Sequence, residues 1–215
     1  MTGIKICGLS TPETIDAAVD AGASHIGLVH FPPSPRHVSL EDAAALRARV
    51  PDAVRTVVLV VDPDEALLAA IVDTVRPDIL QFHGSEAPEA LAVTGAQFDV
   101  ETWKAIGLRD ASALDRSTTY KGCADRLLFD APPALLPGGN GEPFDWALLD
   151  HADIGMPWGL AGGLTPHNVA AAIRRTGAPL VDVSSGVESA PGMKDIALIR
   201  GFCEAVLETD NNRSS

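Results

Sequence analysis

The sequence has few basic residues and few aromatic ones. Its 215 residues include 16 Lys and Arg against 29 Asp and Glu, a formal net charge of −13 with His neutral. Nucleic-acid phosphates and anionic lipids repel so acidic a chain, so we expect neither nucleic acid nor a membrane as a partner. Aromatic residues make up 5% of the chain, so a core must be built mainly from Ala, Val, Leu and Ile.

Cysteines and long apolar segments are also scarce. Apolar runs such as Val57 to Val61 are far shorter than the roughly 20 residues that a membrane-spanning helix needs. The first residues lack a charged segment followed by a long apolar one, so we expect no signal peptide. Three widely spaced cysteines, Cys7, Cys123 and Cys203, argue against a disulfide framework or a zinc knuckle and predict a cytoplasmic protein.

The sequence does contain a regular alternation of two kinds of segment. Short β-branched runs recur at intervals of roughly 20 to 30 residues, and several are apolar almost without interruption, as in parallel strands buried on both faces. These eight runs are residues 4–7, 25–29, 55–61, 78–82, 100–106, 126–129, 157–161 and 180–183. Segments with the apolar spacing of helices lie between them, at residues 12–22, 41–49, 64–75, 86–94, 166–176 and 194–207.

Several of these helices begin with recognisable capping residues. Thr11-Pro12, Asp62-Pro63 and Thr165-Pro166 each pair an N-cap residue with proline at the first helical position. Ser39 and Asp42 resemble a capping box. We therefore expect helices to start at these four places.

The alternation predicts a single-domain α/β protein, a (β/α)8 TIM barrel over residues 1–208. A doubly wound sheet fits less well, because the first strand ends in Cys7-Gly8-Leu9-Ser10 and not in a G-x-G-x-x-G turn. The fifth helical unit, at 108–123, has the weakest pattern. Residues 131–143, rich in proline and glycine, predict a mobile loop, and residues 209–215 predict a flexible C-terminal tail.

In such a barrel the active site lies at the C-terminal ends of the strands. Gly162 and Gly163 follow the seventh expected strand, and Ser184-Ser185-Gly186 follows the eighth. Backbone N–H groups exposed at these turns would bind a phosphate dianion, unless the glycines merely make tight turns. No Lys or Arg occurs in residues 159–173 or 179–193, so we expect dipoles to hold that charge.

Four further side chains are candidates for the chemistry. Cys7 and Asp130 would face each other across the barrel mouth, where a thiol and a carboxyl could move protons on a sugar. The alternatives are a small buried hydrophobe and a loop cap. Arg36 follows a rigid proline-rich turn and either aims at a substrate carboxylate or is a solvated surface charge. His83 is a ligand contact or a packed core histidine, and the six histidines lack metal-ligand spacing.

A set of motifs runs in order from Ile4 to about Phe202. They are Lys5-Ile6-Cys7-Gly8, Ser34-Pro35-Arg36, Gln81-Phe82-His83-Gly84, Gly138-Gly139-Asn140-Gly141 with Phe144-Asp145-Trp146, Leu160 to Val169, Asp182 to Glu188, and Pro191-Gly192 with Lys194-Asp195. Together they resemble the phosphoribosylanthranilate isomerase family, from which Phe82 and residues 138–143 depart in detail.

This resemblance implies an isomerase of tryptophan biosynthesis on a (β/α)8 fold. The family converts N-(5-phosphoribosyl)anthranilate to 1-(2-carboxyphenylamino)-1-deoxyribulose 5-phosphate, an Amadori rearrangement that needs no cofactor and no metal. The resemblance implies Cys7 as the general base, Asp130 as the general acid and Arg36 as the contact to the anthranilate end. It also implies a set of substrate-binding residues, namely His83, Gly162, Gly163, Asp182, Ser184, Ser185 and Gly186.

The protonation of Cys7 is the difficult point of this assignment. A free thiol has a pKa of about 8.5, and an anionic substrate should raise the pKa of Cys7 further. We expect Lys5 to face the other side of its strand, which leaves Arg36 and backbone N–H groups to offset this effect.

Two other functions remain open. The first is the related aminoaldose isomerase of histidine biosynthesis. That family has a pair of aspartates, one of them at the position that Cys7 occupies here, and it binds a second phosphate. An inactive barrel that binds a phosphate ligand is the second, although the presence of both Cys7 and Asp130 argues against it. The expected partner is a small phosphoribosyl substrate, and the expected assembly is a monomer or a homodimer.

Overall fold

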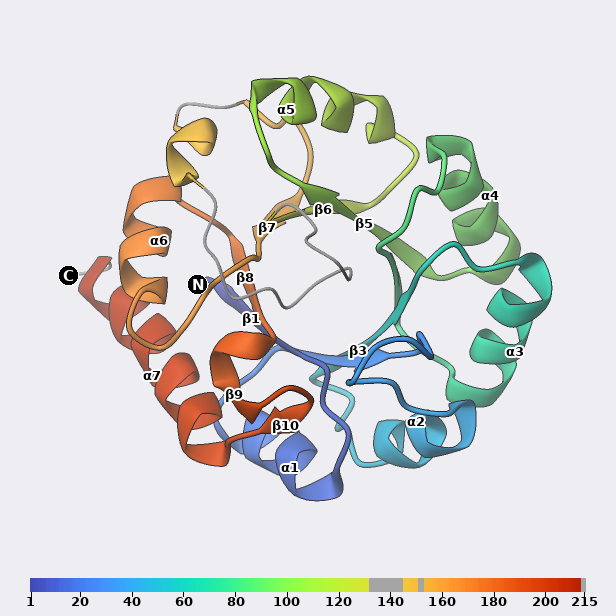
Figure 1. The fold of residues 1–215 in the computed structure, drawn as a ribbon, viewed down its shortest axis with the longest axis horizontal. Helices are drawn as coiled ribbons and strands as arrows, with labels where there is room; N and C mark the ends of the chain where they lie inside the picture. The colour runs from blue at the N-terminus through green and yellow to red at the C-terminus, as the bar shows by residue number, and fades with distance from the viewer. Residues whose placement is uncertain (132–144, 151–152, 214–215) are drawn as a thin grey trace.

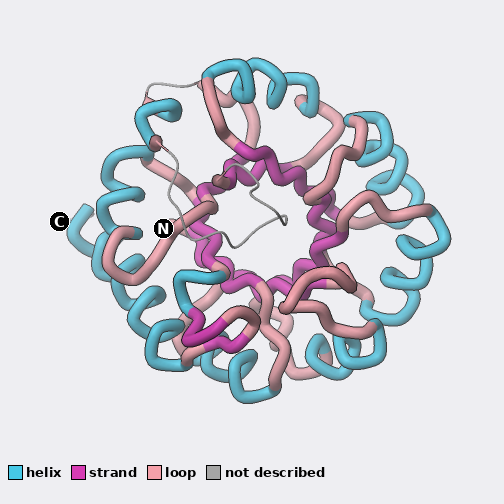
Figure 2. Tube along the Cα trace, in the orientation of Figure 1, coloured by secondary structure: helices cyan, strands magenta, loops and turns pink. Residues whose placement is uncertain are grey.

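The computed structural model describes residues 1–131, 145–150 and 153–213. Parallel strands close into a barrel in the order β1-β2-β3-β4-β5-β6-β7-β8, with helices around the outside (Figure 1, Figure 2). The strands are β1 Gly3–Cys7, β2 His25–Val29, β3 Arg55–Val60, β4 Ile79–Phe82, β5 Glu101–Gly107, β6 Arg126–Asp130, β7 Trp158–Leu160 and β8 Leu180–Val183. Each predicted β-branched run coincides with one of them, so the predicted (β/α)8 barrel is confirmed.

The remaining elements connect these strands. The helices are α1 Pro12–Asp20, α2 Leu40–Arg47, α3 Glu65–Val75, α4 Pro88–Phe98, α5 Ala111–Ser117, α6 Val169–Thr176 and α7 Ile196–Arg213. Short 3-10 turns are η1 Thr118–Tyr120, η2 Trp146–Leu149 and η3 Ser185–Val187, and a hairpin is formed by β9 Glu188–Ala190 and β10 Met193–Lys194. The weak unit at 108–123 thus contains a short helix followed by a 3-10 turn. No helix in the described ranges is long and apolar enough to cross a membrane.

Two of the four predicted helix starts are correct, those of α1 and α2. The Thr11 hydroxyl accepts a hydrogen bond from the Thr14 N–H in a capping box, and Pro12 occupies the first turn. The Ser39 hydroxyl accepts from the Asp42 N–H at 3.0 Å. These local bonds satisfy N–H groups that a helix start leaves without an intrahelical acceptor.

The predicted starts of α3 and α6 are wrong. Asp64, not Asp62, caps α3, because the Asp62 carboxylate accepts from the backbone and hydroxyl of Ser85 in the next loop. Helix α6 begins at Val169, because the side chain of Asn168 accepts from the Thr165 N–H and so holds the preceding residues in a turn.

The expected tail also differs from the structure, because α7 continues to Arg213. The Thr209 side chain is buried and its hydroxyl donates to the Ala205 carbonyl at 2.7 Å. Asp210 accepts from the backbone N–H of Thr2 and, at 2.8 Å, from its hydroxyl. These contacts hold the start of a segment that we expected, from its polar composition, to be a flexible tail. The expected mobile loop lies outside the described residues from residue 132 onward, as does the Gly138-Gly139-Asn140-Gly141 motif.

The barrel interior is a packed core below an open mouth. Inward-facing Val57, Ile79, Trp103, Leu128 and Leu180 form one buried cluster with Ala105. A larger apolar cluster fills the space between the strands and the helices. Because successive strand residues alternate between these two layers, polar side chains near the C-terminal strand ends face the mouth.

Candidate active site

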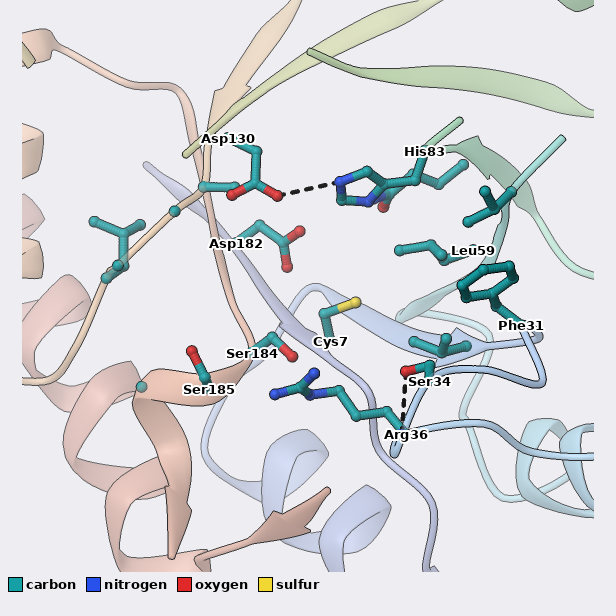
Figure 3. Close-up of a pocket in the computed structure, with 18 residues that line it drawn as sticks. Cys7, Phe31, Ser34, Arg36, Leu59, His83, Asp130, Asp182, Ser184 and Ser185 are labelled. Carbon is teal, nitrogen blue, oxygen red and sulfur yellow. Dashed lines mark hydrogen bonds and ion pairs between the residues drawn. The ribbon is translucent and has the colours of Figure 1, made fainter. Parts of the chain in front are cut away.

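A pocket at the C-terminal ends of the strands gathers every predicted site residue (Figure 3). β1, β6 and β8 supply Cys7, Asp130 and Asp182, while the segments that follow strands supply the others. Those others are Arg36, His83, Gly162, Gly163, Ser184, Ser185 and Gly186. The pocket also contains residues that the sequence did not single out for the site, namely Val29, Phe31, Ser34, Leu59, Val61, Gln81, Ala161 and Leu164.

Cys7 lies above a buried lysine. The Lys5 side chain is fully buried, and its Nζ donates to Asp182 Oδ2 at 2.7 Å. The positive charge of the same ammonium also favours the Cys7 thiolate. The expectation that Lys5 faces away from the site is therefore wrong, because residues two apart on a strand share a face.

Burial raises the pKa of the Cys7 thiol, and Asp182 adds to that rise. Lys5 and Lys194 act in the opposite direction, because their positive charges favour the thiolate. Burial opposes the charge of Lys5 as well, but Asp182 and Cys7 outweigh it and raise the pKa of the Lys5 ammonium. Burial therefore disfavours the Cys7 thiolate, and the neighbouring ammonium groups offset part of that effect.

Asp130 faces the pocket from β6, with His83 beside it (Figure 3). Asp130 Oδ2 lies 3.3 Å from His83 Nε2, and Asp130 Oδ1 accepts from the Ala131 N–H at 2.7 Å. The imidazole and the carboxyl can share a proton, and the Ala131 bond fixes the carboxyl plane. This pair can deliver a proton to an oxygen atom of a ligand.

Three buried polar atoms in this pocket have no hydrogen-bond partner among the described residues. They are Gln81 Oε1, His83 Nδ1 and Asp182 Oδ1. Buried polar atoms are usually paired, so their position indicates a polar ligand. Gln81 was missed from sequence, although it stands two residues before His83 and so shares its face of the chain.

The two glycine turns lie against each other and leave no room for side chains. A Cβ on Gly186 would lie 1.8 Å from the Leu164 carbonyl oxygen, and one on Gly162 would lie 2.3 Å from the Ala131 nitrogen. Gly162 and Gly163 have φ angles of +78° and +64°, which glycine adopts readily. The first N–H groups of η3 have no acceptor in their own turn, so backbone donors are available to an anion.

One cationic side chain does lie close to these turns in the folded protein. Lys194, just beyond the stretches compared in the sequence, donates to the Ser184 carbonyl at 2.8 Å and lies 3.3 Å from its hydroxyl. The expectation that dipoles hold the charge stays a prediction, and the hairpin adds one ammonium group beside the turn.

Arg36 is buried at the edge of the pocket, so it is not a solvated surface charge. Its Nε and Nη2 donate to Glu188 Oε1 and Oε2 at 2.7 and 2.8 Å. Gly8, with φ +78°, lies under the arginine stem, and a Cβ there would be 2.6 Å from Arg36 Cδ. The bidentate contact with Glu188 fixes the guanidinium plane of Arg36.

An apolar surface completes the pocket opposite Asp182. Val29 and Leu59 are buried with Cys7, and Phe31 and Val61 pack against them. The site therefore combines an apolar surface, hydrogen-bond acceptors, a thiol, a carboxyl and a turn with free backbone donors. Among the described residues no group of three or more His, Cys, Asp or Glu side chains could hold a metal ion.

Comparison with known proteins gives a consistent result. Residues 4–205 match the model of the family described as N-(5'phosphoribosyl)anthranilate (PRA) isomerase. N-(5'-phosphoribosyl)anthranilate isomerase of Erythrobacter litoralis is 59% identical over 205 residues, which cover 95% of this chain and 98% of that protein.

Two solved structures share the fold across nearly all of the chain. The phosphoribosyl anthranilate isomerase of Thermotoga maritima is 31% identical with a TM-score of 0.88, covering 97% of this chain and 100% of that one. A second such isomerase, solved with reduced 1-(o-carboxyphenylamino)-1-deoxyribulose 5-phosphate, is 30% identical with a TM-score of 0.86 and the same coverage.

Proposed function

The chain belongs to the N-(5'-phosphoribosyl)anthranilate isomerase family, and from that premise we propose that Cys7 and Asp130 carry out the reaction as general base and general acid. The protein is an isomerase of tryptophan biosynthesis that converts N-(5'-phosphoribosyl)anthranilate to 1-(2-carboxyphenylamino)-1-deoxyribulose 5-phosphate. The observation that carries the assignment of roles is the single pocket in which a thiol, a carboxyl and glycine turns meet.

The reaction begins at Asp130. The protonated carboxyl donates to the ribose ring oxygen as the C1–O bond breaks, and the nitrogen lone pair forms an iminium at C1. The Cys7 thiolate then removes the proton from C2, and the electron pair of the C2–H bond moves toward the iminium to give an enaminol. Protonation at C1 and loss of the C2 hydroxyl proton yield the ketone. The iminium accepts the electrons, so the proposed reaction uses no cofactor.

The charges around Cys7 help this buried side chain to act as a base in its thiolate form. The iminium carbon C1 is bonded to C2, the carbon that carries the proton that Cys7 removes, and its positive charge acidifies that proton. Lys5 and Lys194 stabilise the thiolate from the protein side, against the burial that raises its pKa.

The proposed substrate orientation follows from the two ends of the pocket. The phosphate accepts N–H bonds at Gly162, Gly163 and the Ser184–Gly186 turn. The anthranilate ring lies on the apolar surface, with its carboxylate at Arg36. Asp182 and His83 face the ribose between them.

We further propose that the enzyme works in the cytoplasm on this small-molecule substrate, as a monomer or a homodimer. Support for the compartment comes from the three free cysteines, which suit a reducing environment.

A turnover assay with N-(5'-phosphoribosyl)anthranilate, followed by the loss of anthranilate-type fluorescence, tests the proposal. Cys7→Ser should keep the affinity for the reduced product analogue but lose nearly all turnover, because a hydroxyl is a far weaker base at neutral pH. Cys123→Ser, which lies outside the pocket, is the matched control and should keep wild-type turnover. An active Cys7→Ser enzyme would overturn the role of Cys7, and selective turnover of the aminoaldose of histidine biosynthesis would overturn the function.

A further inference from the structure

The β9–β10 hairpin carries two buried charges that the proposed mechanism does not use as acid or base. The side chain of Glu188 is 3% exposed and that of Lys194 is 1% exposed. Lys194 Nζ donates to Glu188 Oε1 at 2.7 Å, and the Gly192 N–H donates to Oε2 at 3.3 Å. Charges so deeply buried need partners, and each of these two has more than one.

The two residues reach opposite ends of the pocket. Glu188 binds Nε and Nη2 of Arg36, at the end proposed for the substrate carboxylate. Lys194 donates to the carbonyl and lies within hydrogen-bond distance of the hydroxyl of Ser184, at the end proposed for the phosphate. One continuous path of charge-assisted bonds therefore runs from Arg36 through Glu188 and Lys194 to Ser184.

This path fixes geometry at both ends. The bidentate contact holds the guanidinium plane of Arg36 and leaves Nη1 outside the contact. At the other end, the backbone of Ser184 is neither helical nor extended, with φ −126° and ψ −84°, and Lys194 binds both of its oxygens. Moving one end of the path therefore disturbs the other.

We propose that Glu188 and Lys194 are positioning residues that couple the carboxylate-binding end of the pocket to its phosphate-binding end. The enzyme thereby favours ligands that carry two anionic groups at a fixed separation. The proposal rests on the proposed function, because that function supplies the two anionic ends. Arg36 and Lys194 together outweigh Glu188 by one positive charge, which suits a path that lies between two anions.

The experiment uses three ligands as competitive inhibitors of the intact enzyme. Inorganic phosphate probes one end, anthranilate probes the other, and the reduced product analogue spans both. Turnover by the wild-type enzyme is measured first, because its absence would contradict the proposed function and not the coupling. The variants are Arg36→Met, Glu188→Gln and Lys194→Met.

Each variant has its own expected pattern. Arg36→Met should weaken anthranilate binding strongly and phosphate binding to a smaller extent, whereas Lys194→Met should weaken phosphate binding strongly and anthranilate binding to a smaller extent. Glu188→Gln touches neither probe yet should weaken both, and it should raise KM about 10- to 100-fold, far more than it lowers kcat. The double variant Arg36→Met with Glu188→Gln should bind anthranilate little worse than Arg36→Met alone, because Glu188 acts on that end through Arg36.

Two controls separate positioning from general damage. Asp16→Asn breaks the exposed bidentate pair with Arg49, and it should leave all three affinities at wild-type values. Lys194→Arg keeps the charge and should restore much of the phosphate affinity. If Glu188→Gln does not fold, Glu188→Asp keeps the charge but breaks the bidentate geometry and gives the same test.

The proposal is overturned if Glu188→Gln binds anthranilate and phosphate as tightly as the wild type. Tighter anthranilate binding would also overturn it, because Glu188 would then compete with the substrate for Arg36.

Discussion

The two ends of the barrel differ in whether their unmatched buried polar atoms line a pocket. At the N-terminal end, Glu101 pairs with Arg55 and accepts from the Trp103 indole N–H. His25 binds the Ser24 hydroxyl at 2.9 Å, and the His25 and Trp103 ring centres lie 5.2 Å apart. Polar groups here are largely matched within the protein.

Thr56 Oγ1, Arg47 Nε and Arg126 Nε are exceptions at this end, because they are buried without a partner among the described residues, but none of them lines the pocket. The Arg126 guanidinium lies 5.2 Å from the centre of the Trp103 ring, and its Nη1 donates to the Trp158 carbonyl at 3.1 Å. At the C-terminal end, by contrast, Gln81, His83 and Asp182 leave atoms unmatched inside the pocket. One end stabilises the fold, and the other gives up stability to bind a ligand.

The largest expected effect is at the catalytic end. Asp130→Asn should lower kcat by about two to four orders of magnitude, because general acid catalysis typically contributes that much. Affinity for the reduced product analogue and the free energy of unfolding should be kept, as steady-state kinetics and urea unfolding would measure.

The matched control for this prediction lies at the other end. Asp125→Asn alters a carboxylate that accepts from the Thr102 N–H at 2.8 Å, so it should lower stability and keep turnover. If Asp130→Asn keeps near wild-type turnover, or if Asp125→Asn abolishes turnover in a folded protein, the division between the two ends is wrong.

The second effect concerns His25. Burial, helped by the nearby charge of Lys5, lowers the pKa of His25 from 6.5 to about 4. The unfolded chain therefore takes up a proton near its ordinary pKa, whereas the folded protein does not until about pH 4. The free energy of unfolding should fall by up to about 3 kcal/mol as pH is lowered through that interval.

Urea unfolding across this pH range, with His25→Gln beside the wild type, measures that contribution. The His25→Gln protein should show a flatter dependence, whereas the exposed His167→Gln should behave like the wild type. If the free energy of unfolding depends equally on pH in His25→Gln and in the wild type, His25 does not cause the predicted loss of stability.

The smallest effect is at Gln81. Replacing the unmatched amide by leucine should raise the free energy of unfolding by up to about 1 kcal/mol, because a buried polar group without a partner is removed. The same Gln81→Leu change should raise KM, because a ligand hydroxyl loses its acceptor. Gln97→Leu on α4, where the amide binds the exposed Glu65, should leave KM unchanged. A less stable Gln81→Leu protein with an unchanged KM would contradict the contrast between the two ends.

The strands and the candidate site were predictable from sequence for related reasons. Parallel strands buried on both faces appear as apolar runs, and the fold then brings their C-terminal ends together at one mouth. Cys7 and Asp130 could be placed at that mouth by locating strand ends alone. Lys5 could also have been placed correctly, because its separation of two residues from Cys7 fixes its side of the strand.

Other features depend on contacts between distant residues. Arg36 and Glu188 are separated by 152 positions, so no local pattern shows that the guanidinium already has a partner. The start of α3 was misplaced because Asp62, a suitable cap by local rules, binds Ser85 in another loop. Local propensity ranks such alternatives only weakly, and tertiary contacts decide between them.

The ion pair beneath Cys7 also closes the barrel. Lys5 and Asp182 lie opposite each other where β1 pairs with β8, and 177 positions separate them. The contact between Ile4 and Ser24 on the other side of β1 spans only 20 positions. Loop-closure entropy grows by about 0.6 kcal/mol per doubling of length, so this seam is harder to close by about 2 kcal/mol. Local opening between β1 and β8 would separate the strand that carries Cys7 from the strand that precedes the Ser184 turn. Such an opening would therefore also disrupt the active site.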